Sequence, residues 1–158
     1  MSLPFRVLGV NHAGLAPKDP ARAKDFFASM LGLFHLGDEH VVSQKTMTSM
    51  FSSSGKTSPS GSIEPRLEIL ADDGSPDGPI GKFLDKRGAG IHHLALTVDS
   101  VDQALIWLKK NGVRLIDQEP RPGAHNTRIA FIHPEATGGL LLELVEESPH
   151  PGPQKSLA

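Results

Sequence analysis

The sequence contains no cysteine and no tyrosine, and it lacks any long hydrophobic run. Without cysteine there can be no disulfide bonds, thiolate metal sites or cysteine nucleophiles, which agrees with a cytoplasmic location. No apolar run approaches the roughly 20 residues that span a bilayer, so we expect no membrane partner. The first residues, Met1 to Arg6, lack the basic stretch and apolar core of a signal peptide.

An excess of charge of one sign is also missing. The chain has 16 Lys and Arg against 18 Asp and Glu, a formal net charge of −2. A nucleic-acid-binding domain normally presents a basic face, so we expect no nucleic-acid partner. With 38% apolar and 22% charged residues, the 158-residue chain has a globular composition. Its length suits one domain, or two small modules that share a core.

Capping residues and apolar periodicity predict helices. Asp19 and Ser100 are N-cap candidates for two helices, and Gly32 and Gly112 are the expected ends of those helices. A shorter helix is expected at 79–87. The strand-like segments are Val7–Ala16, Met47–Ser52, Arg66–Leu70, Ile91–Val98, Thr127–Ile132 and Leu140–Val145. The Ser-, Gly- and Pro-rich stretch 51–65 predicts a long hairpin loop, and residues 148–158 predict a disordered tail.

The two halves of the chain share a spacing of histidine and helix start. His12 lies seven residues before Asp19, and His93 lies seven residues before Ser100. Each half later carries one glutamate in an apolar strand, Glu68 and Glu143; the histidines are 81 residues apart and the glutamates 75. Two pairs at nearly the same offset indicate an internal duplication of a strand–helix–strands module.

The repeated residues have two interpretations. Each glutamate could lie on the solvated face of an alternating strand, or it could be buried beside a cation. Burial of a lone carboxylate costs several kcal/mol, so burial would require a metal or another positive group nearby. Two imidazoles and two carboxylates form an N/O ligand set for a divalent first-row metal. His92 competes with His93 for this role, and the repeat favours His93.

Several longer segments resemble the vicinal oxygen chelate superfamily, and within it the methylmalonyl-CoA epimerases. The resemblance covers residues 7 to about 147. The segments that carry it are Asn11–Ala16, Ser75–Leu84, Gly90–Ala95, Gln118–His125, Phe131–Pro134 and Gly138–Leu144. The run from Gly88 to Leu144 is the more specific part, whereas the His12 segment is generic to the superfamily.

The resemblance implies an α+β fold in which two tandem βαβββ modules form a curved mixed sheet around a metal site. The single domain would span 5–147, with one module at about 5–72, a linking helix at about 77–88 and the second module at about 90–147. The implied metal ligands are His12, Glu68, His93 and Glu143. The implied cofactor is a divalent metal ion: Co, Mn, Ni, Zn or Fe.

The implied function is metal-dependent epimerisation of methylmalonyl-CoA through C2 deprotonation and a stabilised enolate. Glu143 is the candidate catalytic acid/base, and His40, His125 or a water could supply the second proton-transfer group. The positions that depart from the family pattern include Glu135, which replaces the usual lysine after His133-Pro134, together with Thr48 and Glu68. Thr48 occupies the place of a proposed catalytic glutamate in some epimerases, and Glu68 replaces a glutamine found in some of them.

Other functions of the same superfamily remain open. A glyoxalase-I-type lyase would use the same four ligands on a glutathione hemithioacetal, and a related isomerase could act on another acyl-CoA. A dioxygenase is disfavoured because its facial triad has one carboxylate fewer. A metal-free binding protein would lack the ligand set. The family also implies a possible homodimer.

Overall fold

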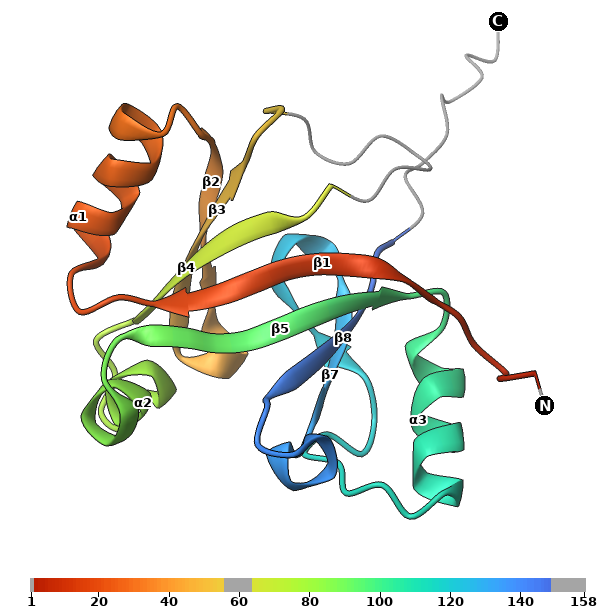
Figure 1. The fold of residues 1–158 in the computed structure, drawn as a ribbon. Helices are drawn as coiled ribbons and strands as arrows, with labels where there is room; N and C mark the ends of the chain where they lie inside the picture. The colour runs from red at the N-terminus through yellow and green to blue at the C-terminus, as the bar shows by residue number, and fades with distance from the viewer. Residues whose placement is uncertain (1, 56–63, 149–158) are drawn as a thin grey trace, which may run out of the picture.

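The computed structural model describes residues 2–55 and 64–148, which form one curved mixed sheet with helices packed against it (Figure 1). The strands are β1 (Val7–Ala16), β2 (Phe34–Val41), β3 (Thr46–Ser52), β4 (Arg66–Asp72), β5 (Gly90–Val98), β6 (Arg121–Pro122), β7 (Arg128–Ile132) and β8 (Leu142–Glu146). The helices are α1 (Pro20–Asp25), continued by a π-helical turn (Phe26–Met30), α2 (Pro79–Arg87) and α3 (Val101–Lys110). Short 3-10 turns occupy Val42–Gln44, Ala124–Asn126 and Pro134–Thr137.

The sheet repeats one connection pattern. The strand order is β2-β3-β4-β1-β5-β8-β7-β6. β1 pairs with β4 in parallel, β5 pairs with β8 in parallel, and β1 and β5 pair antiparallel at the centre, where they run side by side in Figure 1. This topology confirms the predicted α+β fold with two βαβββ units in a curved mixed sheet. The residue limits of the two modules stay a prediction.

Buried and partly exposed residues alternate along the central strands, which separates an inner from an outer face of the sheet. On β5, His93, Ala95 and Thr97 are buried, while the residues between them are partly exposed. On β8 both faces are covered: Leu144 packs in a core beneath α3, and Val145 packs with Ala95 on the other side. Since neighbouring residues of a strand point to opposite faces, Glu143 shares the inner face with Val145.

Two segments differ from the sequence expectation. The first helix is regular only over Pro20–Asp25 and then widens into the π-helical turn, where Phe26 and Met30 remain 50% and 70% exposed. β2 was not predicted, because its residues mix charged, apolar and glycine positions without clean alternation. The predicted loop 51–65 and tail 148–158 fall largely on residues 56–63 and 149–158, outside the described residues.

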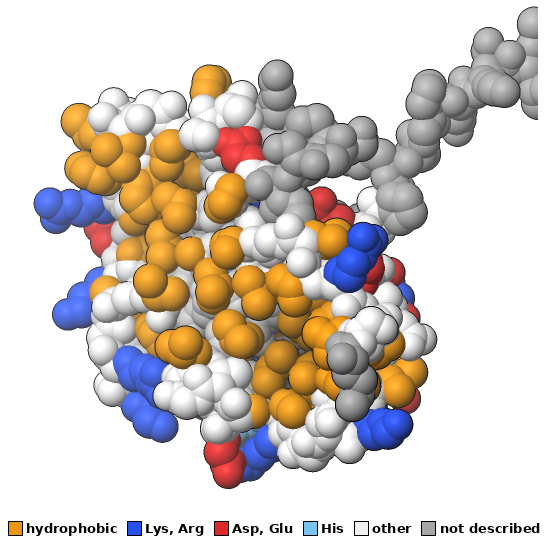
Figure 2. Space-filling view, turned by 45° about the vertical axis from the view of Figure 1, so that its right-hand side comes forward, with side chains coloured by type: hydrophobic (Ala, Val, Ile, Leu, Met, Phe, Trp, Pro, Cys, Tyr) orange, Lys and Arg blue, Asp and Glu red, His pale blue; other side chains and the backbone are white. Residues whose placement is uncertain are grey.

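Hydrophobic side chains gather over a broad part of the face shown in Figure 2. Exposed apolar residues include Val7 and Val10 of β1 and Met30 of the π-helical turn. None of the described helices is long and apolar enough to cross a membrane.

Candidate metal-binding site

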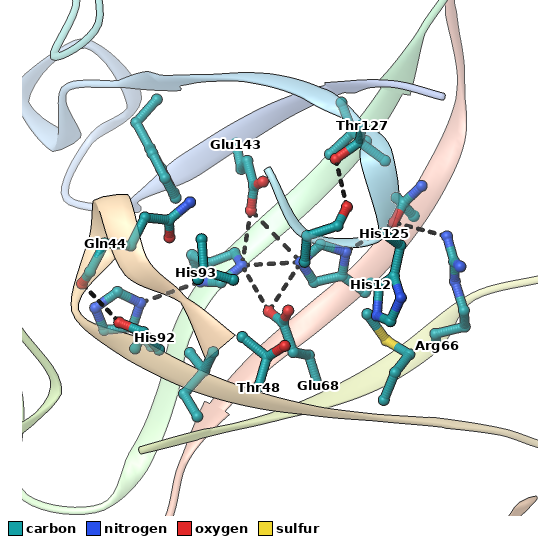
Figure 3. Close-up of a pocket in the computed structure, with 18 of the residues that line it drawn as sticks. His12, Gln44, Thr48, Arg66, Glu68, His92, His93, His125, Thr127 and Glu143 are labelled. Atoms are coloured by element: carbon teal, nitrogen blue, oxygen red, sulfur yellow. Dashed lines mark hydrogen bonds and ion pairs between the residues drawn. The ribbon is translucent and has the colours of Figure 1, made fainter. Parts of the chain in front are cut away.

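Four buried polar side chains meet on the inner face of the sheet, one from each of the four central strands (Figure 3). His12 comes from β1, Glu68 from β4, His93 from β5 and Glu143 from β8. Each is between 4% and 6% exposed. The sequence predicted that these residues would come together, and the structure brings them together; of the two interpretations of the glutamates, the buried one is correct.

The contacts within this cluster are short. The Nε2 atoms of His12 and His93 are 3.0 Å apart. Glu68 Oε2 lies 3.2 Å from His12 Nε2 and 3.5 Å from His93 Nε2. Glu143 Oε2 lies 3.5 Å from His12 Nε2 and 2.9 Å from His93 Nε2. Each carboxylate therefore faces both imidazoles.

These separations fit a metal site. Ligand atoms bound at roughly 2.1 Å with right angles between them lie about 3.0 Å apart. The ligand atoms of His12, Glu68 and His93 all lie within 4.8 Å of one another, so this group could hold a metal ion. Glu143 reaches the same two imidazole nitrogens from its own strand. The donor set, two imidazoles and two carboxylates, suits a divalent first-row metal.

In the metal-free protein, the residues of the cluster shift one another's pKa values. Burial alone lowers the pKa of His12, but hydrogen bonds and charge from Glu143 and Glu68 outweigh it and raise this pKa to about 9. Burial alone raises the pKa of Glu143, but hydrogen bonds from His12 and His93 lower it to about 2. At neutral pH an imidazolium and a carboxylate thus occupy the place where a cation would bind.

Neighbouring residues orient the His93 ring. Gly14 lies opposite His93 in the β1–β5 register, and a Cβ atom at Gly14 would come within 2.3 Å of the imidazole. The Nδ1 atom of His93 is 3.1 Å from Nδ1 of His92. Burial, with the nearby charge of His93, lowers the pKa of His92 to about 4, so a neutral His92 can accept a hydrogen bond there. His92 thus lines the same pocket and contacts the cluster through His93.

The cluster lies in a pocket of about 730 Å³. Thr48 lines this pocket next to Glu68 in Figure 3, and its buried hydroxyl has no hydrogen-bond partner among the described residues. His125 also lines the pocket, and its backbone N–H donates to Glu39 of β2 at 2.7 Å. His40 does not line it, and its ring pairs with Asp73 at 2.7 Å.

Among the polar residues of the pocket wall that sequence reasoning missed, Asn11, Arg66 and Glu147 contact one another beside His12. The Nδ1 atom of His12 lies 2.7 Å from Oδ1 of Asn11, and Arg66 contacts both Asn11 and Glu147. Only the position of Asn11 next to His12 could have signalled this group, because the other two residues are distant along the chain.

Comparison with known proteins places this site in a family. A protein from Bacillus subtilis named "Uncharacterized protein YqjC" is 36% identical over 87% of this chain and 91% of its own length. The mitochondrial methylmalonyl-CoA epimerase of Bos taurus is 32% identical over 85% of this chain and 72% of its own. The crystal structure of methylmalonyl-CoA epimerase from Mycobacterium tuberculosis is 34% identical, with a TM-score of 0.81 over 94% of both chains.

The family model that matches covers residues 11–131, a range that holds the first three members of the cluster. Its match across most of the sequence agrees with the paired βαβββ topology and with the site at the centre of the sheet. The chain belongs to the Glyoxalase/Bleomycin resistance protein/Dioxygenase superfamily.

Proposed function

We propose that this protein is a metal-dependent epimerase of methylmalonyl-CoA. The observation that carries the proposal is the buried cluster of His12, Glu68, His93 and Glu143 at the base of a pocket. The curated and structural relatives named as methylmalonyl-CoA epimerases support the substrate.

In this proposal the four cluster residues are the metal ligands. The bound divalent metal would supply Lewis-acid stabilisation of the negative charge that develops on substrate oxygens. The pocket wall includes the apolar residues Leu70, Ile80 and Phe131, which would limit the access of water to a bound substrate. An apolar surrounding lowers the effective dielectric constant and so strengthens electrostatic interactions within the site.

The proton at C2 of the substrate needs one acceptor and, on the opposite face, one donor. Glu143 is our candidate for one of these roles, because its carboxylate lines the pocket beside the two imidazoles of the cluster. Thr48 has no carboxylate and cannot be the second acid/base. His125 is a better candidate for that role than His40, since only His125 lines the pocket.

One observation favours a second candidate function. Glu68 is a carboxylate where the resemblance gives some epimerases a glutamine, and a glyoxalase-I-type lyase would use the same four ligands as this chain. That enzyme would also abstract a proton next to a carbonyl and stabilise the resulting anion. An isomerase of another acyl-CoA would leave the role of each residue unchanged.

Proton NMR of methylmalonyl-CoA in deuterated water tests the proposal directly. With cobalt-loaded protein we expect the C2 proton signal to disappear, and with chelator-treated protein we expect it to persist. A stereospecific coupled assay then distinguishes epimerisation from simple exchange. Absence of exchange with cobalt shown to be bound would overturn the epimerase assignment, and glutathione hemithioacetals would be the next substrates to test.

A homodimer and a cytoplasmic location also belong to this proposal. The exposed apolar side chains of Figure 2 support association of two copies, because burial of such a surface is favourable. Sedimentation of the purified protein would measure its oligomeric state.

A further inference from the structure

A β-bulge places two consecutive residues of β1 on the same side of the sheet. The register with β5 shifts between Val10 and His12, so that Asn11 is the extra residue. Regular alternation would point Asn11 away from the pocket; the bulge instead lets Asn11 and His12 both line it. Asn11 is 2% exposed.

The side-chain amide of Asn11 makes four hydrogen bonds, which use both of its ends. Its Oδ1 accepts from His12 Nδ1 at 2.7 Å and from Arg66 Nη2 at 3.1 Å. Its Nδ2 donates to Thr97 Oγ1 at 3.0 Å and to Glu147 Oε1 at 2.9 Å. Arg66 Nη2 also donates to Glu147 Oε1 at 2.6 Å, which closes the network.

The chemistry of these partners fixes the orientation of the amide. A guanidinium can only donate, so the Asn11 atom that faces Arg66 must be the oxygen. An ionised carboxylate can only accept, so the atom that faces Glu147 must be the amide nitrogen. The Asn11 oxygen cannot donate either. His12 must therefore carry a proton on Nδ1, and its Nε2 is left to face Glu68 and Glu143.

We propose that Asn11 is a positioning residue that fixes the tautomer and ring orientation of His12, and that Arg66 and Glu147 hold Asn11 in the required orientation. This inference rests on the metal site of the proposed function. A metal-binding imidazole whose second nitrogen donates to a fixed acceptor keeps its ring in place and is a more basic ligand.

A purely structural role for Asn11 makes a different prediction. Asn11 and Arg66 belong to β1 and β4, whereas Thr97 belongs to β5 and Glu147 directly follows β8, so the network could serve only to join the two halves of the molecule. Thr97 separates the two roles, because its hydroxyl contacts the Nδ2 end of Asn11, whereas His12 contacts the Oδ1 end. Thr97→Val removes one hydrogen bond of the same amide with little change in shape.

The experiment measures the affinity of the metal-free protein for Co²⁺, followed by its visible absorption, in the wild type and in Asn11→Leu, Asn11→Asp and Thr97→Val. We expect Asn11→Leu to weaken Co²⁺ binding by about 10–100-fold. Asn11→Asp keeps an acceptor for His12 and Arg66 but sets a second carboxylate against Glu147, so it should retain more Co²⁺ affinity than Asn11→Leu and less than the wild type. Thr97→Val should bind Co²⁺ unchanged even if it unfolds at a lower temperature.

A second readout reports the tautomer itself. In the Zn²⁺-loaded, nitrogen-15-labelled wild type, His12 should show an Nδ1–H proton that exchanges slowly with water. Asn11→Leu should lose that protection. If Asn11→Leu does not fold, Arg66→Met replaces it, with a smaller loss of Co²⁺ affinity expected because only the anchor of the amide is removed.

Unchanged Co²⁺ affinity in Asn11→Leu, or in Arg66→Met where that variant replaces it, would overturn the inference. Equal losses of Co²⁺ affinity in Asn11→Leu and Thr97→Val would also overturn it. So would a wild-type His12 that is protonated on Nε2 in the Zn²⁺-loaded protein. A wild type that binds no Co²⁺ would overturn the metal site as well. A failure of the proposed function can thus be told apart from a failure of this inference.

Discussion

The imidazole of His93 occupies space that only a glycine leaves open on the neighbouring strand. A Cβ atom at Gly14 would lie 2.3 Å from the ring, far inside contact distance. We expect Gly14→Ala to displace His93 from the cluster and to remove most of the Co²⁺ affinity. Gly90→Ala is the matched control, because Gly90 lies at the start of β5 with open space around it. Equal Co²⁺ affinities in the two variants would contradict the steric argument.

His93 and Glu143 form the shortest imidazole–carboxylate contact of the cluster, at 2.9 Å. We expect His93→Ala and Glu143→Ala each to abolish metal binding and activity, since either change removes one of the four proposed ligands. The fold should persist, because the surrounding strands keep their pairing; circular dichroism would check this. Glu119→Ala, at an exposed position, is the control. Full metal content in either cluster variant would refute the four-ligand assignment.

Thr48 is the residue that departs from the pattern of some epimerases. Its hydroxyl is buried, and among the described residues it has no hydrogen-bond partner. We expect Thr48→Ala to have only a mild effect on turnover, because a hydroxyl cannot serve as the missing carboxylate base. Steady-state kinetics would measure the effect, and complete loss of activity would show that this side chain takes part in proton transfer.

At the scale of single residues, the sequence predicted the site residues that recur in both halves of the chain and missed those that do not recur. His12 and His93, with Glu68 and Glu143, could be found because each pair recurs at a similar offset in an apolar strand. The role of Asn11 depends on a bulge that no residue pattern announces. Arg66 and Glu147 become its partners only when the fold brings residues that lie 55 and 136 positions away along the chain beside it.

Among the elements, α2 begins with backbone donors that its own N-cap residue, Gly78, does not satisfy. Asp72, at the end of β4, accepts from the N–H groups of Ile80 at 2.9 Å and Gly81 at 2.6 Å. We expect Asp72→Ala to lower the free energy of unfolding by about 0.5–2 kcal/mol, as loss of a cap does. Urea unfolding would measure this. Asp85→Ala, at an exposed position of the same helix, should have little effect, and equal losses would contradict the capping role.

The elements that the sequence predicted best are those with strong caps or uninterrupted apolar runs. α3 was placed correctly because Ser100 caps it and Val101, Ala104 and Leu105 are all buried. The first helix was placed correctly only at its start. The apolar spacing of its second half indicates a helix, but the widened turn leaves Phe26 half exposed. The periodicity of apolar residues does not reveal whether another element covers the apolar face of a helix.

For the whole molecule, the cluster makes the stability of the metal-free protein depend on pH. The pKa of His12 is raised from 6.5 to about 9, so its contribution is complete below 6.5 and is lost as the pH rises through about 9. The pKa of Glu143 is lowered from 4.5 to about 2, so its contribution is complete above 4.5 and is lost as the pH falls through about 2.

We therefore expect the contribution of the cluster to the stability of the metal-free protein to be greatest between about 4.5 and 6.5, and to fall on the alkaline side. Urea unfolding in the presence of a chelator, over a series of pH values, would measure this. His12→Gln serves as the comparison, since it removes the group that titrates near 9. An identical alkaline decline in wild type and variant would contradict the assignment to His12.

The position of the cluster across the β1–β5 seam has a consequence for how the two halves depend on each other. His12 and Glu68 come from one side of that seam, and His93 and Glu143 from the other. Neither half alone holds more than two of the four donors, so a chain cut between Arg87 and Gly90 should yield two fragments that each bind metal poorly. Mixing them should restore tight binding only when they dock. Co²⁺ absorption would then report fragment complementation, with the ion acting as a reversible cross-link between the halves.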